Sequence, residues 1–351
     1  MRKLTTVALI IVLLLLVAVT SAVAAKVTDR DILETAKGLI EKNPQQAKQM
    51  LAGIIARAKK NTPEVGGAYY LKGRMENDDD VAIGHLRKAY SISSEIRGNA
   101  GNYLAYRIWK KGDRMGAAAQ WKDVGAKFPE KAMSSFLSAA NCYAGAASAN
   151  VAMRTPWRAE AMRLYKIVAN SNTEGASFAR LQILGLRCEN AMNLKESREA
   201  VNADLDDYVA DTTNSADNRV RAAFMVIEFF LSPPKGTAKQ PEEAMERLDK
   251  VISIAKDPVN VAWALTLKGE CLKALGKNEE AIAVYDGIIS QFGDADPATY
   301  NMRGNDALAN AFFYKADCLR KLGKEDEAAK AEATLLLKCP NSIFAKEVQK
   351  G

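Results

Sequence analysis

The sequence predicts an all-α protein, built as a superhelical α-α solenoid of about eight helical hairpins. Apolar residues recur with helical spacing along almost the whole chain, and no alternation of apolar and polar residues typical of strands is longer than chance gives. In addition, the residue pattern of 267–277 returns at 314–324. Acidic residues and an alanine follow each copy, which indicates a repeated pair of helices.

The composition favours a binding protein over an enzyme. The 351 residues include 49 Lys+Arg and 42 Asp+Glu, a small positive excess that indicates no nucleic-acid partner. His85 is the single histidine, so a Ser/His/Asp triad or a His-rich zinc site cannot be assembled. We therefore predict a protein without catalytic residues, a metal site or a cofactor.

The first 25 residues have the pattern of a secretory signal peptide. Arg2 and Lys3 precede an apolar run over 7–19, and small residues at 22–24 fit a cleavage site. We expect cleavage near residue 25 and export of the mature chain. The alternative is an uncleaved anchor helix, since the apolar run is almost long enough to span a bilayer.

The N-terminal part of the mature chain predicts four hairpins, because helix-spaced apolar residues alternate with short turns. A shortened turn at 77–80 belongs to the second hairpin, and about nine extra residues enlarge the turn of the fourth at 145–156. In chain order these hairpins cover residues 29–42 with 44–60, 69–89, 104–129 and 140–168.

Four more hairpins follow, the first two irregular and the last two regular. A Pro-Pro-Lys-Gly sequence at 233–236 opens the second irregular hairpin. Residues 342–350 are expected to add a short capping helix. The hairpins cover residues 174–191 with 195–210, 216–231 with 241–255, 265–288 and 312–340.

The two last hairpins resemble the tetratricopeptide repeat. Small residues at Gly269, Ala281, Ala316 and Ala328 let paired helices approach closely, and larger apolar residues fill the seams between hairpins. The resemblance implies three parts: a signal peptide at 1–25, divergent repeat-like hairpins at 26–258, and two better-matching repeats with a C-terminal cap at 259–351.

Five cysteines are spread over the chain, an odd number that does not suit a disulfide framework. Cys142, Cys271 and Cys318 recur at one point of the repeat, where a small residue faces a neighbouring helix. We predict free, buried thiols at these positions.

The resemblance also implies where a partner binds. Such repeats usually bind a protein or peptide in a concave groove lined by the first helix of each hairpin. Exposed Trp, Tyr and Arg side chains are the types that carry binding energy. The predicted groove residues are Tyr70, Arg74, Tyr106, Trp109, Lys110, Asn141, Trp263, Glu270, Lys273, Phe313, Asp317 and Arg320, with Leu137 and Thr266 beside them. Leu137, Thr266 and Phe313 stand where a chaperone-type carboxylate clamp would need Lys.

The residues from Cys339 to Ala345 are similar to the last repeats of periplasmic and outer-membrane-associated tetratricopeptide repeat proteins. This resemblance implies a non-enzymatic scaffold or adaptor in a bacterial cell envelope, in outer-membrane assembly, cell-wall synthesis or division. The alternative is a periplasmic ligand- or glycan-binding solenoid, which requires Trp109, Trp121 or Trp157 to share an exposed cleft. Peripheral membrane association stays open.

Overall fold

A computed structural model describes residues 27–92, 95–193, 195–233, 238–294, 301–302 and 305–350. The predicted signal peptide and its cleavage site lie outside these residues. Within them, eight helical hairpins follow one another and a short helix ends the chain, so the predicted all-α solenoid is confirmed. None of the described helices combines the length and the apolar character needed to cross a membrane.

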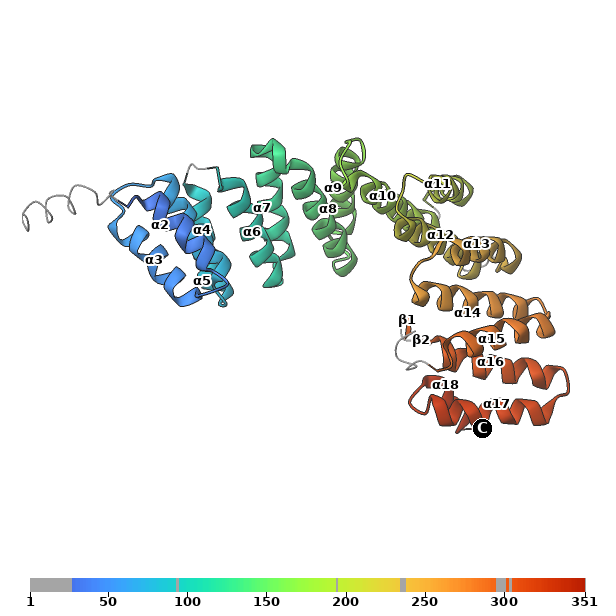
Figure 1. The fold of residues 1–351 in the computed structure, drawn as a ribbon. Coiled ribbons are helices and arrows are strands. Elements are labelled where there is room, and N and C mark those ends of the chain that lie inside the picture. Colours follow the sequence, from blue (N-terminus) through green and yellow to red (C-terminus); the bar gives the residue numbers. More distant parts are fainter. Residues whose placement is uncertain are drawn as a thin grey trace, which may run out of the picture. The chain divides into compact units, whose positions relative to one another are not determined.

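The chain divides into two compact units, which meet in sequence between Ile167 and Val168. The first unit holds the first four hairpins (Figure 1). Their helices are α2 (Asp29–Leu39), α3 (Pro44–Arg57), α4 (Pro63–Met75), α5 (Asp79–Ser91), α6 (Arg97–Lys110), α7 (Arg114–Lys127), the 3-10 turn η1 (Pro129–Lys131), α8 (Ala132–Ala149) and α9 (Arg154–Ala169).

The second unit holds the other four hairpins and the terminal helix. Its helices are α10 (Gly175–Met192), α11 (Arg198–Ala210), α12 (Ala216–Leu231), α13 (Pro241–Ile254), α14 (Pro258–Ala274), α15 (Asn278–Phe292), α16 (Ala307–Lys321), α17 (Glu325–Lys338) and α18 (Ile343–Val348). Two-residue strands β1 (Asn301–Met302) and β2 (Asn305–Asp306) pair antiparallel just before α16. The predicted boundary at residue 258 stays a prediction.

Helix starts follow from side chains that accept backbone hydrogen bonds. Thr28 and Asp31 form a reciprocal capping box at α2, and Asn43 caps α3 just before Pro44. The carboxylate of Asp78 accepts from the backbone N–H groups of Asp80 and Val81 and so starts α5. The acidic run at 78–80 therefore ends a turn and begins a helix.

Glycines end both first helices of the two regular hairpins. Gly276 and Gly323 have φ of 74° and 73°, a left-handed conformation that a side chain would strain. After α14, the N–H of Lys277 donates to the carbonyl of Leu272 at 2.9 Å, and the N–H of Gly276 donates to Lys273 at 3.1 Å. These two bonds form a Schellman motif, which turns the chain back into α15.

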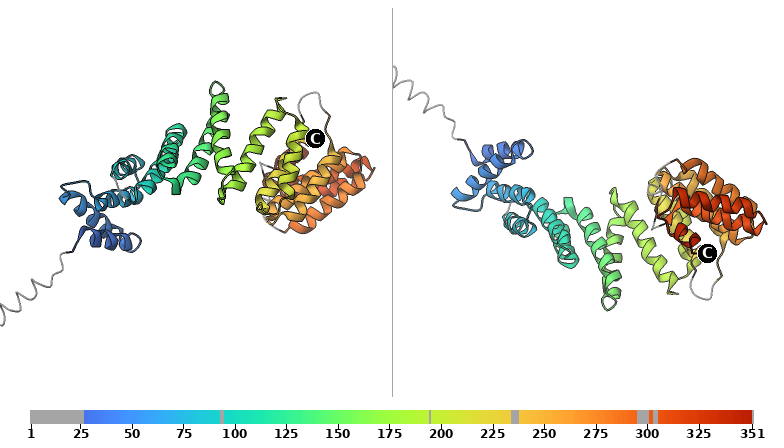
Figure 2. Two further views of the ribbon diagram at one scale, coloured as in Figure 1. Left: turned by 90° about the horizontal axis from the view of Figure 1, so that it is seen from above. Right: turned by 90° about the horizontal axis from the view of Figure 1, so that it is seen from below.

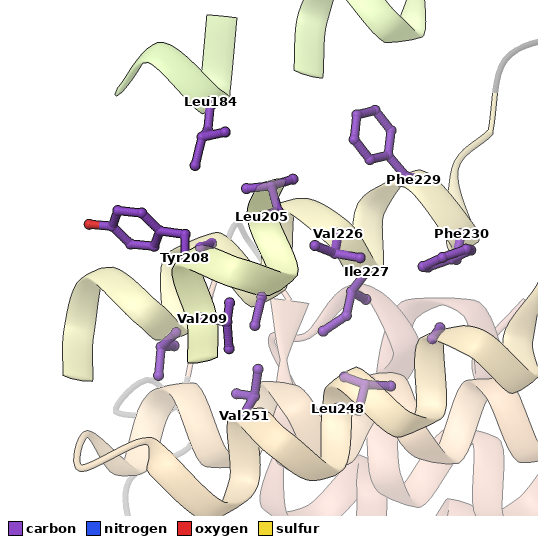
Figure 3. Close-up of a cluster of buried hydrophobic side chains, with 14 of the residues drawn as sticks. Leu184, Leu205, Tyr208, Val209, Val226, Ile227, Phe229, Phe230, Leu248 and Val251 are labelled. Atoms are coloured by element: carbon purple, nitrogen blue, oxygen red, sulfur yellow. The ribbon is translucent and has the colours of Figure 1, made fainter. Parts of the chain in front are cut away.

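Within each unit, every hairpin packs against the next one along the chain, so neither unit has one central core (Figure 1 and Figure 2). In the second unit one cluster of buried side chains continues from α10 to α14 (Figure 3). Leu205 of α11, Ile227 of α12 and Leu248 of α13 meet in it with exposures of 0–1%. A comparable cluster in the first unit contains Leu51, Leu86 and Leu104.

One expected turn is wrong. The fourth hairpin has no enlarged loop at 145–156, because α8 continues to Ala149 and α9 begins at Arg154. The additional residues extend both helices, to 18 and 16 residues. The alanine-rich end of α8 favours helix, and Ala146 and Ala147 are buried there.

Candidate functional site

The first helices of consecutive hairpins contact one another within each unit, as α4 contacts α6 and α14 contacts α16. Their outward side chains therefore form a continuous surface, which we call the first-helix face. All twelve predicted groove residues lie on first helices: α4, α6 and α8 in the first unit, α14 and α16 in the second.

Four aromatic side chains form a chain of ring contacts on the first-helix face of the first unit. We call Tyr70, Tyr103, Tyr106 and Trp109 the aromatic strip. The centroids of Tyr70 and Tyr103 are 5.9 Å apart in an edge-to-face pair that joins α4 to α6. Tyr103 and Tyr106 follow at 6.3 Å, and Tyr106 and Trp109 at 6.0 Å with nearly parallel rings.

The outer end of the strip faces solvent. Tyr106 and Trp109 are each 46% exposed, whereas Tyr103 is half-buried. Tyr70 is 8% exposed, so the prediction that its ring belongs to the surface is wrong. Tyr70 instead packs in the buried cluster of the first unit and contacts the ring of Tyr103. Helical periodicity alone did not predict Tyr103 as a surface residue.

Arg74 covers the buried end of the strip. Its guanidinium carbon lies 5.7 Å from the centroid of Tyr70 and 5.2 Å from that of Tyr103, within cation–π range of both rings. The Arg74 side chain is exposed, and no carboxylate of the described residues pairs with it.

Arg107, which the sequence pattern did not predict as a site residue, connects α6 to the end of α4 and the start of α5. The side chain is 8% exposed and pairs with Asp79 at the start of α5. One nitrogen, Nη2, donates to the carbonyls of Glu76 at 2.7 Å and Arg74 at 3.3 Å, where α4 ends. Carbonyls at a helix end lack partners within the helix, so Arg107 satisfies them from the next hairpin.

Lys110 shares the Asp79 carboxylate with Arg107. Its Nζ lies 3.2 Å from Oδ2 of Asp79, and the hydrogen bond from Arg107 holds the pKa of Asp79 below its ordinary value. The Lys110 amine is therefore directed towards the start of α5. Arg107 and Lys110 thus share the carboxylate of Asp79, whereas Arg74 contacts two rings of the strip.

Asn141 lies apart from this cluster on α8. Its side-chain oxygen accepts a hydrogen bond from the hydroxyl of Tyr165 at 2.6 Å, which joins α8 to α9. Asn141 remains exposed, and Leu137 one turn earlier is half-buried. The structure places both on the first-helix face without a ring contact to the aromatic strip.

In the second unit, two predicted residues form a bridge between α14 and α16. Nζ of Lys273 lies 3.3 Å from Oδ2 of Asp317 and 3.6 Å from the ring centroid of Tyr314. Burial alone would raise the pKa of Asp317, but the hydrogen bond from Lys321 and the charge of Lys273 lower it. Both side chains therefore already have partners in the chain.

The remaining predicted residues of this unit also contact neighbouring helices. Glu270 accepts from the amide of Asn310 at 3.1 Å, and Phe313 packs on Phe344 of the terminal helix at 5.1 Å. Arg320 pairs with Glu332 of α17 at 2.6 Å.

Thr266 is fully buried and donates to Ala262, so it is no surface residue. Trp263 is half-buried in a small apolar cleft between α12 and α14, of about 150 Å³, beside Phe224, Leu231 and Leu267.

The cysteine thiols lie in the packed interior and not at a reactive site. Burial raises the pKa of the Cys142 thiol to about 11 and that of Cys271 to about 12, far from a reactive thiolate. All five cysteines are free, and four are buried, which confirms the prediction for Cys142, Cys271 and Cys318. In the part of the chain that the structure describes, no three His, Cys, Asp or Glu side chains gather as a metal site.

The sequence match to a known family falls in the second unit. The tetratricopeptide repeat model matches residues 263–295 and 310–342. The chain carries two tetratricopeptide repeats. The matched residues correspond to hairpins α14–α15 and α16–α17, the two that the internal repeat predicts, with the glycine-terminated first helix that each contains.

Several solved structures are also similar to this chain. The C-terminal part of a TPR repeat-containing protein from Cytophaga hutchinsonii is 12% identical, with 90% of this chain and 98% of that chain covered and a TM-score of 0.48. A Rap protein complexed with competence and sporulation factor is 14% identical, with 92% and 99% covered and a TM-score of 0.36. No curated protein matches the chain.

Proposed function

We propose that the protein is a non-enzymatic scaffold or adaptor, which binds a segment of another protein along the first-helix face of its first unit. The exposed end of the aromatic strip, Tyr106 and Trp109, carries this proposal. Contiguous exposed aromatic side chains are uncommon on a surface without a binding role, and Trp and Tyr dominate binding energy at protein interfaces. The first-helix face of the second unit supports binding less, because its charged residues are paired with each other.

The place of action that we propose is a bacterial cell envelope. The apolar N-terminal segment with its basic start supports export, and the similarity of residues 339–345 to periplasmic repeat proteins supports a role in outer-membrane assembly, cell-wall synthesis or division. A membrane-bound form with an uncleaved anchor accommodates the same binding face.

Glycan binding, the alternative considered from the sequence, has less support. Trp109 lies on the first helix α6, whereas the half-buried Trp121 and Trp157 lie on the second helices α7 and α9. The clefts beside Asp80 and Asp123, beside Ser171 and Asn218, and beside Phe224 and Trp263 do not include any of these three side chains.

Site-specific photo-cross-linking in cells tests the binding face. A photoreactive amino acid replaces Tyr106 in one strain and Leu337, which is 81% exposed on α17, in a control strain. We expect a discrete protein adduct at position 106 that Trp109→Ala weakens by about tenfold or more, and no such adduct at 337. Equal adduct patterns at both positions would contradict the proposal.

N-terminal sequencing of the protein from separated cell fractions tests the export. A start near residue 26 in the envelope or periplasmic fraction is the expected result. A cytosolic chain that keeps Arg2 and Lys3 would exclude it.

A further inference from the structure

The turn of the fourth hairpin projects further than the turn of a regular hairpin (Figure 2). In a regular hairpin, α14 ends at Ala274, five residues after the small packing residue Gly269. In the fourth hairpin, α8 ends at Ala149, nine residues after the corresponding Ala140. α9 begins seven residues before Ala161, whereas α15 begins three residues before its own alanine. Four additional residues on each helix therefore carry the turn about 6 Å outward.

The surface of this turn is apolar and uncharged. We call residues 149–153 the apolar tip. Val151 is 76% exposed and Met153 is 40% exposed, and the side chains of Ala149 and Ala152 are exposed beside them. Every other turn inside a hairpin contains Lys, Asp or Glu in its sequence. A contiguous exposed apolar surface of this kind marks contact with a partner or a membrane.

The polar backbone groups of the apolar tip have partners close by in the chain. The N–H of Met153 donates to Oδ1 of Asn150 at 3.1 Å, and the N–H of Asn150 donates to the carbonyl of Ala146 at 3.2 Å. Nε of Arg154 donates to the carbonyl of Ala147 at 3.3 Å, in the last turn of α8. Groups that are already hydrogen-bonded lose less solvation when they leave bulk water, so insertion of the tip costs less free energy.

Arginine side chains from two helices lie at the base of the apolar tip. Arg154 and Arg158 are one helical turn apart on α9, on the same side of the helix. Burial and then the charge of Arg154 lower the pKa of Arg158. From α7, Nη1 of Arg114 lies 3.0 Å from the position that a Cβ on Gly145 would occupy, one turn before α8 ends.

The carboxylates that flank these arginines in sequence have other partners. Residues 131–159 contain no Asp or Glu. Glu160 pairs with Lys122 at 2.6 Å and with Arg163 at 2.8 Å, and Asp113 caps the start of α7. The base of the apolar tip therefore carries an excess of positive charge.

We propose that the apolar tip inserts into the headgroup region of an anionic lipid bilayer, with Arg154 and Arg158 beside the lipid phosphates. Interfacial segments bury their apolar side about 5–10 Å deep, and the additional projection of the tip reaches this depth. Trp157 lies half-buried one turn beyond Met153, and tryptophan is enriched at membrane interfaces. The inference goes beyond the proposed function, since the tip is the end of a hairpin and not part of the first-helix face.

An environment-sensitive dansyl amino acid tests the inference on the full chain. It replaces Val151 in one protein and Leu337, which is 81% exposed on α17, in the control. The vesicles contain phosphatidylcholine alone or an equimolar mixture with phosphatidylglycerol. We expect blue-shifted emission at position 151 with the mixed vesicles, which weakens at high ionic strength, and no shift at 337. Binding through the apolar N-terminal segment is common to all samples, so it does not produce this difference.

Substitutions in the protein with the label at 151 separate insertion from folding. Met153→Asp, at an exposed position, should lower the equilibrium constant for insertion about tenfold or more, as a lipid titration of the blue shift measures. Leu337→Asp is the matched control and should leave the constant unchanged. Arg154→Gln should lower it about fivefold, whereas Arg154→Lys keeps the charge and should lower it much less. Circular dichroism shows whether each variant keeps its helices.

Four outcomes overturn the inference. These are no blue shift at 151 with the mixed vesicles, an equal shift at 337, an equal shift with phosphatidylcholine alone, and an unchanged shift in Met153→Asp. The cross-linking at Tyr106 detects a protein partner and not lipid, so it tests the proposed function separately.

Discussion

Arg107 of α6 pairs with Asp79 of α5, and the same guanidinium donates to the carbonyls that end α4. One buried side chain thus joins a turn of the second hairpin to the first helix of the third. In a solenoid without a central core, such a link fixes the angle between neighbouring hairpins. It also holds Asp79 where Lys110 meets it.

Arg107→Met should destabilise the protein by about 2–4 kcal/mol, because helix-end carbonyls and a carboxylate lose their buried donor. Urea unfolding followed by circular dichroism measures the change. Arg87→Met, at an exposed arginine of α5, is the control and should cost at most about 0.5 kcal/mol. A similar small cost at Arg107 would show that the link does not stabilise the fold.

Gly269→Ala should destabilise the seventh hairpin, because a Cβ at this position would lie 2.4 Å from Cε1 of the fully buried Tyr285. A loss of about 1–3 kcal/mol is expected from overpacking. Gly287→Ala in α15 is the matched control, since its Cβ would meet nothing within 4 Å. That variant should gain up to about 1 kcal/mol from helix propensity, and thermal unfolding should separate the two in sign.

Glu160 should make part of the free energy of unfolding depend on pH in the acidic range. The hydrogen bond from Arg163, followed by that from Lys122, lowers the pKa of Glu160 from 4.5 to about 2. A lowered pKa stabilises the folded state above the unfolded value, so this contribution is complete above pH 4.5 and disappears as the pH falls towards 2.

Partial exposure of its partners limits the contribution of Glu160 to about 1 kcal/mol. Denaturant titrations of wild type and Glu160→Gln should therefore differ at pH 7 and converge near pH 2. The control is Glu130→Gln, at an exposed carboxylate. An equal difference at both pH values would contradict the assignment.

The cysteines should resist alkylation while the chain is folded. Burial raises the pKa of Cys271 and Cys339 to about 12, so few thiolates exist at pH 8. Iodoacetamide labelling read by mass spectrometry should be slow in the native protein and reach all five thiols in denaturant. Fast labelling of Cys142, Cys271, Cys318 or Cys339 at pH 8 would contradict its buried position.

The repeated helical pairs could be predicted because the residues that start, end and pack each helix recur at short, regular spacing in the sequence. Gly276 and Gly323 mark where first helices end, and Ala281 and Ala328 mark where helices approach closely, so spacing alone gives the hairpins. The enlarged turn at 145–156 could not be predicted correctly, because extra residues in a pattern fit a loop or longer helices equally well. Burial of Ala146 and Ala147 decided for helix.

The candidate site divides in the same way. Helical position selected Tyr106, Trp109 and Arg74, and the structure brings them into one region together with Tyr103. Helical position also selected Tyr70 and Thr266, which are buried, because periodicity gives the face of a helix but not the depth that neighbouring helices cover. The role of Arg107 could not be predicted from the sequence, because its partners lie in the preceding hairpin, about 30 residues away.

By itself the sequence determined that this chain forms stacked helical pairs, since helix periodicity, capping residues and small contact residues act over distances of a few residues. Only the tertiary structure decided which aromatic and charged side chains remain free for a partner. The exposure of these side chains depends on ion pairs between hairpins. In the second unit Lys273 pairs with Asp317, whereas in the first unit Arg74 contacts two aromatic rings and pairs with no carboxylate of the described residues.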